Sequence, residues 1–442
     1  MRRNPLMLLL AVLWVSACSS PNDKATMQTA SGDVPAADSG ATTAQTATCA
    51  PDNAGLKLPT GFCATLFADS VAGARHMWVA PNGDVYVSSE ARNAGGIWLL
   101  RDANHDGRAD ARAKIASGFR SSEVRMYDGY LYTEDLTGVL RFPYKPGSME
   151  PATALDTVVQ GLSGGGDHFN KTFTIASDGT IYLNIGSPSN ACQEKNRATS
   201  SPGIDPCAQL DTRAGIWTFD AHKLHQSYST GVHFATGIRN AVGVAINPMD
   251  DKLWVTQHGR DQLGGPNGNW PFDAKYSAEN PAEELLQVNK GDDFGWPYCY
   301  YAFPTRHLVL APEYGGDGTK VGRCADKKEP VAVFPAHWAP NGLLFYTGSQ
   351  FPARYKRGAF IAFHGSWNRA PEPQAGYNVT FQPLNGEKAA GAYEIFASGF
   401  APQSGGTNGN HRPTGLAQGP DGSLYVADDA GGHIWKISYK GK

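Results

Sequence analysis

Residues 76–87 read His-Met-Trp-Val-Ala-Pro-Asn-Gly-Asp-Val-Tyr-Val, and Gly-Ile-Trp-Leu-Leu follows at 96–100. Short apolar runs flank the Asn-Gly turn, which is typical of antiparallel strands joined by a hairpin. Asn-Gly favours such hairpins because both central positions of the tight turn require positive φ. The stretch therefore predicts a unit of three short strands.

The same unit recurs along the chain. Each copy has a short apolar strand, a turn, an aromatic-rich strand and a further strand. The other five copies begin at Val124, Lys171, Val242, Gly342 and Thr414. Repeated strand-rich units without long amphipathic helices between them are typical of a β-propeller, in which each blade packs on its neighbours. We therefore predict an all-β fold, a six-bladed β-propeller over residues 49–442.

Unequal spacing between the copies predicts long insertions between blades. The longest run from Pro188 to Arg213, from Asp261 to Glu283 and from Tyr298 to Trp338. Loops of this length on a rigid scaffold commonly build a binding face. We therefore expect the insertions to shape a ligand site.

The N-terminus has the features of a bacterial lipoprotein signal. Two arginines precede an apolar run, Leu6 to Val15, that is too short to span a bilayer. Val-Ser-Ala-Cys at 15–18 resembles a lipobox, in which Cys18 becomes the lipid-bearing N-terminus; an ordinary cleaved signal is the alternative. Residues 1–18 are thus predicted to be a signal peptide, and 19–48, which lack aromatic residues, a disordered tether. The serine after the cysteine favours a periplasmic protein anchored at the outer rather than the inner membrane.

Composition limits the classes of partner. Only 18% of residues are charged and the net charge is -3, so no basic surface favours nucleic acid, and a small neutral or acidic ligand is favoured. In an exported chain the six cysteines beyond Cys18 are expected to form disulfides. Nearness in sequence favours the local pairs Cys49–Cys63, Cys192–Cys207 and Cys299–Cys324, although spacing alone leaves other pairings open.

Five polar segments directly adjoin the predicted blade strands. They are residues 164–170, 237–240, 257–261, 364–369 and 410–414. A propeller would bring such segments together at one end of its central channel. They are therefore the candidates for a common site.

Two residue types in these segments suit chemistry. His168 follows three glycines and Asp167, so a ligand can approach the backbone closely and a neutral imidazole can take a proton. A surface histidine with a local hydrogen bond is the alternative. Arg239, Arg369 and Arg412 lie on three different blades, and a planar guanidinium suits carboxylate groups. An ordinary salt bridge is the alternative for each arginine.

An aspartate-rich loop suggests a calcium site. Residues 102–110 read Asp-Ala-Asn-His-Asp-Gly-Arg-Ala-Asp, which spaces oxygen atoms as calcium loops do. No glutamate closes the loop at the twelfth position that such loops use. A polar turn without a metal is therefore the alternative.

The sequence resembles the soluble sugar dehydrogenases that depend on pyrroloquinoline quinone (PQQ), especially their sorbosone and pyranose dehydrogenase branch. The resemblance extends from about Leu58 to the C-terminus. Its most specific stretches are Gly-Ile-Arg-Asn-Ala-Val-Gly at 237–243, Gly-Asp-Asp-Phe-Gly-Trp-Pro-Tyr-Cys-Tyr at 291–300 and Phe-His-Gly-Ser-Trp-Asn-Arg at 363–369. It implies oxidation of a sugar or a sugar-derived aldehyde.

The resemblance implies a role for one histidine. His168, directly after Asp167, occupies the place of the general base in that family. It would remove a proton from an anomeric hydroxyl or a hydrated aldehyde while hydride passes to C5 of the quinone. The resemblance therefore makes His168 and Asp167 the candidate catalytic residues.

The resemblance also implies cofactor contacts. Arg239 and Asn240 match the pair that contacts the quinone carbonyls, and Arg412 matches an arginine that faces a cofactor carboxylate. The main-chain carbonyls of Gly259 and Arg260 match ligands of a calcium ion bound with the quinone.

Two positions depart from the glucose dehydrogenase pattern. Thr414 stands where a second arginine is expected, and Asn368 or Arg369 stands where a lysine contacts the cofactor. These departures leave the exact substrate open, and nothing in the sequence identifies the electron acceptor.

Two other functions are compatible with a propeller. A calcium-dependent lactonase would hold its metal with side chains such as Glu123, Asp167, Asn240 and Asp261. A propeller that only binds another envelope protein would need none of the proposed catalytic residues.

Overall fold

The computed structural model describes residues 49–198, 200–264, 272–401 and 411–441. The predicted signal peptide, Cys18 and the tether at 19–48 lie outside these residues. In the described part, no helix combines the length and the apolar character that crossing a bilayer requires.

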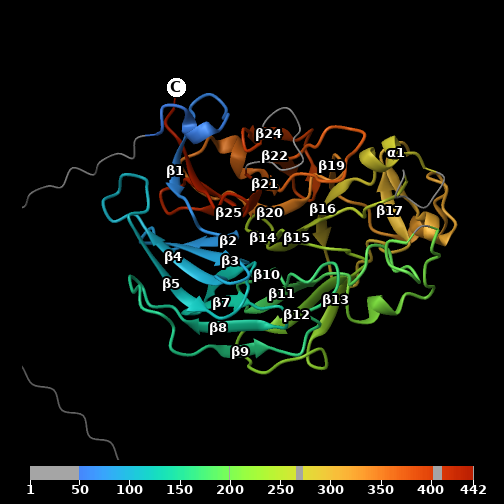
Figure 1. The fold of residues 1–442 in the computed structure, drawn as a ribbon, viewed down its shortest axis with the longest axis horizontal. Helices are drawn as coiled ribbons and strands as arrows, with labels where there is room; N and C mark the ends of the chain where they lie inside the picture. Colours follow the sequence, from blue (N-terminus) through green and yellow to red (C-terminus); the bar gives the residue numbers. More distant parts are fainter. Residues whose placement is uncertain (1–48, 199, 265–271, 402–410, 442) are drawn as a thin grey trace, which may run out of the picture. The chain divides into compact units, whose positions relative to one another are not determined.

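Six antiparallel sheets follow one another along the chain (Figure 1). The first contains β2 (Ala74–Val79), β3 (Val85–Ser89), β4 (Gly96–Arg101) and β5 (Ala111–Ser117). The second contains β6 (Val124–Tyr127), β7 (Tyr130–Glu134), β8 (Val139–Pro143) and β9 (Asp156–Val159). The third contains β10 (Phe173–Ile175), β11 (Thr180–Ile185), β12 (Gly215–Asp220) and β13 (Val232–Thr236). The fourth contains β14 (Val244–Asn247), β15 (Lys252–Gln257), β16 (Glu283–Val288) and β19 (Ala332–Phe334). The fifth contains β20 (Pro340–Phe345), β21 (Gly358–Phe363), β22 (Asn378–Asn385), β23 (Lys388–Ala389) and β24 (Glu394–Ala397). The sixth contains β25 (Pro413–Gln418), β26 (Leu424–Asp428), β27 (Ile434–Tyr439) and β1 (Phe62–Ala68).

The first strands of the sheets form a closed ring. β2 contacts β6, β6 contacts β10, and the contacts continue through β14, β20 and β25 back to β2. Each predicted unit supplies the first three strands of one sheet. The predicted six-bladed β-propeller is therefore confirmed.

One strand of the sixth blade comes from the other end of the chain. β1 pairs antiparallel with β27, with Phe62 opposite Tyr439 and Leu66 opposite Trp435. The repeat pattern assigned no blade to residues 62–68, because the partner of this strand is almost the whole chain away. Pairing the two ends closes the ring of blades.

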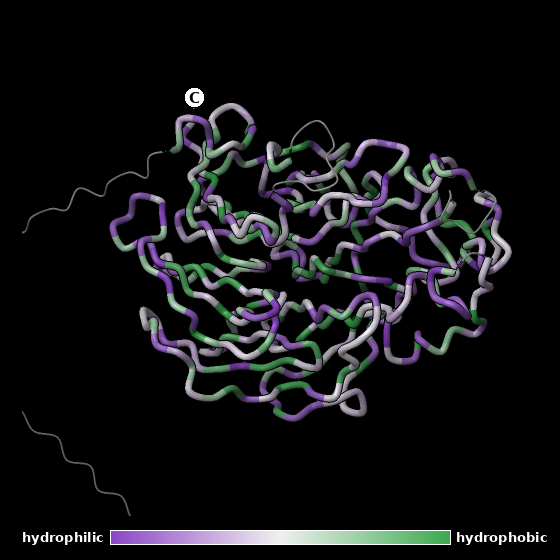
Figure 2. The backbone as a smooth tube through the Cα atoms, in the orientation of Figure 1, coloured by the Kyte–Doolittle hydropathy of each residue, from purple (hydrophilic) through white to green (hydrophobic). Residues whose placement is uncertain are grey.

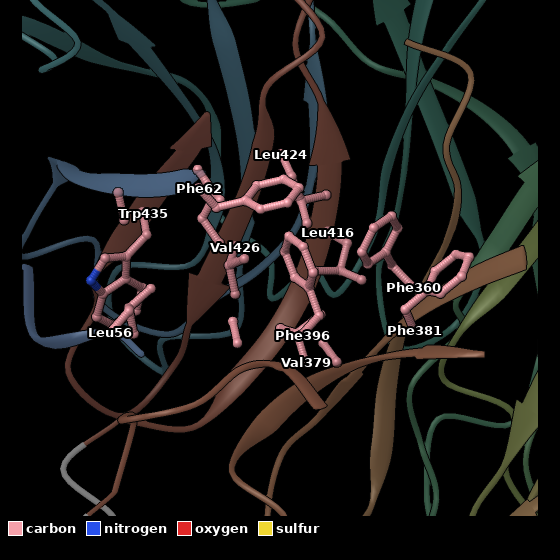
Figure 3. Close-up of a cluster of buried hydrophobic side chains, with 14 of the residues drawn as sticks. Leu56, Phe62, Phe360, Val379, Phe381, Phe396, Leu416, Leu424, Val426 and Trp435 are labelled. Carbon is pink, nitrogen blue, oxygen red and sulfur yellow. The ribbon is translucent and has the colours of Figure 1, made fainter. Parts of the chain in front are cut away.

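The interface between the fifth and sixth blades is aromatic (Figure 3). The ring of Phe62 lies 4.8 Å from that of Phe351 and 5.0 Å from that of Phe396, centroid to centroid, in edge-to-face geometry. Such pairs add stabilisation beyond the burial of apolar area. β1 therefore contributes to packing as well as to hydrogen bonding. Figure 2 shows the same division along the chain, with hydrophobic stretches in the strands and hydrophilic stretches in many of the loops.

The three predicted disulfides are confirmed. The Cα atoms of Cys49 and Cys63 are 5.7 Å apart, those of Cys192 and Cys207 6.3 Å, and those of Cys299 and Cys324 5.8 Å. The second and third bonds lie within the predicted insertions. These insertions also contain the hairpin of β17 (Cys299–Ala302) and β18 (His307–Leu310) and the short helix α1 (Ala274–Glu279). Five short 3₁₀ helices complete the described elements: Asn53–Gly55, Ala208–Asp211, Pro312–Tyr314, Gly322–Asp326 and Ala353–Lys356.

Candidate active site

A cavity of about 380 Å³ lies at one end of the blades. Most of its lining residues lie in the segments directly before a first strand or directly after a second strand. In an antiparallel sheet, the start of one strand and the end of its neighbour lie at the same end of the sheet. The structure thereby brings seven of the nine predicted site residues to one cavity: Asp167, His168, Arg239, Asn240, Gly259, Asn368 and Arg412.

His168 is held in one tautomer. Its Nδ1 lies 2.8 Å from the main-chain oxygen of Ser187 and 2.9 Å from the hydroxyl of the same residue. A carbonyl oxygen only accepts, so Nδ1 carries the proton and Nε2 has the free lone pair. Burial, and then the positive charge of Arg239, hold the pKa of His168 well below its usual value. The imidazole is therefore a neutral proton acceptor at pH 7.

Asp167 does not orient His168. Its carboxylate accepts a hydrogen bond from Arg197 at 2.8 Å and lies within 3.4 Å of the amide nitrogen of Asn196. The side chain of this candidate catalytic residue therefore forms an ion pair at the cavity wall. The main-chain oxygen of Ser187 orients the imidazole of His168.

Asp261 links residues from several loops. Its carboxylate accepts from Arg239 at 3.1 Å, from Arg197 at 3.0 Å and from the side-chain amide of Asn368 at 2.7 Å. The two arginines hold the pKa of this buried carboxyl below its usual value, although burial alone would raise it. Asp261 is therefore a charged anchor for two of the predicted cofactor contacts.

Several polar groups in the cavity have unused binding capacity. The side-chain oxygens of Asn240 and Asn341 are buried and accept no hydrogen bond within the described residues. Arg412 donates to the main-chain oxygens of His364 at 3.0 Å and Gly365 at 2.6 Å, and in the described part of the chain its guanidinium forms no ion pair. Buried polar groups are normally satisfied, so the two amide oxygens suit a ligand that donates hydrogen bonds, and Arg412 suits an anionic group on a ligand.

Two predicted site residues lie outside the cavity lining. Arg260 is buried and forms an ion pair with Glu313 at 2.5 Å. Arg369 donates to the main-chain oxygens of Ala278 at 3.0 Å and Ala336 at 2.9 Å, and so joins loops instead of facing a ligand.

One of the two predicted calcium ligands is already engaged by a side chain. The carbonyl oxygen of Gly259 accepts a hydrogen bond from Arg239 at 2.9 Å. A divalent cation on that oxygen would lie beside a fixed positive charge. The nearby carboxylate of Asp261 is already paired with two arginines.

The aspartate-rich loop at 102–110 is a separate feature. Asp102 accepts from the main-chain nitrogens of Asp106 at 3.1 Å and Gly107 at 2.9 Å, and Asp110 accepts from that of Ala103 at 3.0 Å. These are the hydrogen bonds of a polar turn. The loop contributes no residue to the cavity lining.

Comparison with known proteins identifies the family. The TrAA12-like family model matches residues 56–440. The chain belongs to the TrAA12-like family. The match covers all six blades, so the cavity lies wholly within the family region.

Several proteins are similar in sequence to this TrAA12-like chain. It is 23% identical over 333 residues to the "Pyrroloquinoline quinone-dependent sugar dehydrogenase" of Hypocrea jecorina, covering 70% of the chain and 71% of that protein. It is 24% identical over 277 residues to "Aldose sugar dehydrogenase YliI" of Escherichia coli, covering 62% of the chain and 60% of that protein. The chain spans only 48% of the length of an uncharacterized relative from Borreliella burgdorferi.

Solved structures share the fold of this TrAA12-like chain. The PQQ domain of pyranose dehydrogenase from Coprinopsis cinerea superposes with a TM-score of 0.70 at 21% identity, covering 87% of this chain and 97% of that one. At this identity the likeness supports the propeller fold alone.

Sequence reasoning missed several residues of the TrAA12-like cavity. Arg75 stands at the start of β2, where the other motifs also lie, so its position was a usable signal. Glu90, which pairs with Arg75 at 3.4 Å, follows β3 in the same way. Arg197 comes from within a long insertion, and no local pattern marks it. Trp367 belongs to a quoted motif, but only its exposure in the structure draws attention to it.

Proposed function

We propose that this chain is a PQQ-dependent sugar dehydrogenase that oxidises a sugar, or an aldehyde derived from one. One observation carries the proposal: a neutral His168 with its free Nε2 shares a cavity with Arg239, Asn240 and Arg412. This combination offers a base beside a site for an anion. The names of the relatives from Hypocrea jecorina and Escherichia coli agree with it.

The cavity suits a cofactor that carries several carboxylates and carbonyls. Arg412, which forms no ion pair among the described residues, would hold a carboxylate, and Arg239 would donate to a carbonyl or carboxylate oxygen. The amide nitrogens of Asn240 and Asn368 would donate to carbonyl oxygens. PQQ, when bound, supplies the acceptor for the hydride that leaves the substrate.

The chemical role of the protein is to hold the substrate and move a proton. His168 Nε2 would accept the proton of the substrate hydroxyl, since Nδ1 is committed to Ser187. The resulting imidazolium would be positively charged, and the negative charge of Asp261 would stabilise it. The proton would then pass to solvent through the cavity mouth.

The test is reconstitution of the purified protein with PQQ. We expect a bound-cofactor absorption spectrum and reduction of a soluble dye with a panel of aldoses and aldehydes. The titration is run with and without calcium, so that a calcium requirement shows directly. Absence of both a bound spectrum and turnover would remove the proposal.

A pair of histidine variants tests the base. His168→Ala should bind PQQ normally while kcat falls by roughly 10² to 10⁴-fold. His258→Ala is the matched comparison: its imidazole lines the same cavity, but its Nε2 lies 3.2 Å from the main-chain oxygen of Pro340 and is committed to that contact. We expect a smaller loss for His258→Ala. Equal losses, or lost cofactor binding in His168→Ala, would contradict the assignment.

The carboxylates that a metal-dependent lactonase would use are already engaged. Glu123 lies outside the cavity lining and pairs with His76 at 2.7 Å and Arg125 at 3.2 Å. Asp167 and Asp261 both pair with Arg197. The dehydrogenase is therefore the function that the arrangement favours.

We also propose that the mature chain is a lipoprotein of the periplasm, attached through Cys18. The support is the Val-Ser-Ala-Cys sequence after an apolar run. Cys18→Ser should move the protein from the membrane to the soluble fraction and abolish labelling by a fatty acid. Unchanged fractionation would refute the anchor.

A further inference from the structure

One tryptophan is exposed at the cavity. Eight of the ten tryptophans lie in the described residues, and seven of them are buried or half-buried. Trp367 alone is exposed, to 61%, and it lines the cavity that holds His168. Large apolar groups left in solvent beside a cavity often mark a contact with a ligand or partner.

The exposure of Trp367 is imposed by a well-anchored loop. The residues on either side, Ser366 and Asn368, are both fixed. Ser366 is buried, accepts from the main-chain nitrogen of Ala375 at 2.8 Å, and its carbonyl oxygen accepts from the hydroxyl of Tyr377. Asn368 donates to Asp261 at 2.7 Å. The backbone of Trp367 is therefore held on both sides.

The start of the same loop is equally constrained. His364 bonds to Asp429 at 2.8 Å, and the carbonyl of Gly365 accepts from Arg412 at 2.6 Å. Gly365 has a φ of +88°, and a Cβ there would lie 2.2 Å from the ring of Tyr377, so only glycine fits. A loop built so tightly holds the backbone of Trp367 in a defined place beside the cavity.

The chemistry of the surroundings suggests what the indole binds. An indole offers a flat, apolar face with negative π density, which attracts polarised C–H groups. A pyranose ring has such a C–H face, while its hydroxyl groups project from the rim. The ion pair of Asp167 and Arg197 lines the same cavity, is partly exposed, and can exchange hydrogen bonds with hydroxyls.

We propose that Trp367 is the platform on which the pyranose ring of the substrate stacks, so that the site favours ring-closed aldopyranoses over small acyclic aldehydes. This inference rests on the proposed dehydrogenase function. It assigns Trp367 to substrate binding, apart from the proton transfer at His168 and the anchoring of the cofactor at Arg239 and Arg412.

The test compares variants of the PQQ-loaded enzyme. Trp367→Ala should raise KM for an aldopyranose about fivefold to tenfold, in line with the loss of one stacked aromatic contact. Trp367→Phe, which keeps an aromatic face, should restore most of the affinity. KM for glycolaldehyde and the Kd for PQQ should stay unchanged. Met249→Ala, at an exposed residue outside the cavity lining, is the control and should behave as the wild type.

Other outcomes would overturn the inference. An unchanged pyranose KM would show that Trp367 has no role in substrate binding. A weaker PQQ affinity would assign Trp367 to the cofactor, and an altered KM for the dye alone would assign it to the electron acceptor. Pyranose binding is also measured by calorimetry on the same proteins. Lack of any sugar oxidation by the wild type would refute the proposed function, whereas equal calorimetric affinities of wild type and Trp367→Ala would refute the stacking.

Discussion

The imidazole of His168 owes its reactivity to its environment. A main-chain oxygen fixes its tautomer, and burial together with Arg239 disfavours the protonated form. A main-chain partner cannot be removed by mutation of Ser187, which makes this orientation robust. The same contacts leave Nε2 unprotonated over a wide range of pH.

The lowered pKa of His168 predicts the acid limb of the pH profile. Protonation removes the base, so activity is lost only as pH falls through the folded-state pKa, which lies below the usual 6.5. We therefore expect kcat/KM for sugar to stay high through pH 6.5 and to decline at lower pH. A midpoint at or above 6.5 would contradict this environment. The measurement is kcat/KM between pH 4 and 8, with stability checked at each pH.

Removal of an aspartate that pairs with arginine should have different effects at the cavity, for Asp261, and on the surface. Asp261→Asn removes the negative charge between two buried or half-buried arginines, so we expect the Kd for PQQ to rise and stability to fall by about 3 kcal/mol. Asp205→Asn removes the exposed partner of Arg323, 2.7 Å away, and should change neither quantity measurably. Cofactor titration and chemical denaturation measure both. Equal effects in the two variants would show that Asp261 has no special anchoring role.

At the scale of the element, β16 carries an unusual pair of acids. Glu283 and Glu284 begin a strand in which every residue is buried. Burial raises the pKa of each carboxyl to about 8, so both are largely protonated at pH 7. Glu283 accepts from the main-chain nitrogens of Gly259 and Ala339, which ties this strand to the cavity wall.

Glu284→Gln is expected to make stability less dependent on pH. The folded-state pKa is raised, so the protonated carboxyl favours the folded state below the unfolded pKa, and this contribution is lost as pH rises towards 8. Glutamine stays neutral and can still accept from Gln257. The variant should match the wild type near pH 4 and exceed it by on the order of 4 kcal/mol at pH 8. Denaturation curves at both values measure the difference, and a constant difference across pH would contradict the shifted pKa.

At the scale of the whole molecule, the ring is closed by β1. Phe62 of this strand packs against Phe351, Tyr355 and Phe396 of the fifth blade. The strand thus joins the sixth blade by hydrogen bonds and the fifth by packing. Loss of this contact should weaken the closure of the ring and so the whole propeller. The cavity should be affected as well, because its lining residues come from five of the six blades.

Phe62→Ala is therefore expected to lower the free energy of unfolding by about 3–5 kcal/mol, as for other buried aromatic residues. Ile395→Ala, at a position that is 52% exposed in β24, is the control and should change it little. Thermal and denaturant unfolding of both variants provides the measurement. A small effect of Phe62→Ala would show that closure of the ring does not depend on this residue.

Much of the fold could be predicted from local patterns. Hairpin turns such as Pro-Asn-Gly at 81–83 and Pro-Asp-Gly at 420–422 mark strand boundaries within a few residues, so six units were visible. The disulfides were also local, with separations of 14, 15 and 25 residues. His168, Arg239 and Arg412 could be nominated because each directly precedes a predicted strand or unit.

The contacts that build the site required the tertiary structure. Arg75 pairs with Asp429 across 354 positions, and Asn368 reaches Asp261 across 107, distances over which sequence periodicity carries no information. The ion pair of Asp167 with Arg197 likewise joins a short loop to a long insertion, and no local pattern marks it. By itself the sequence determined the strands, their turns and the local crosslinks, because these depend on neighbouring residues. Which side chains meet in the cavity was decided only when closure of the ring placed distant loops side by side.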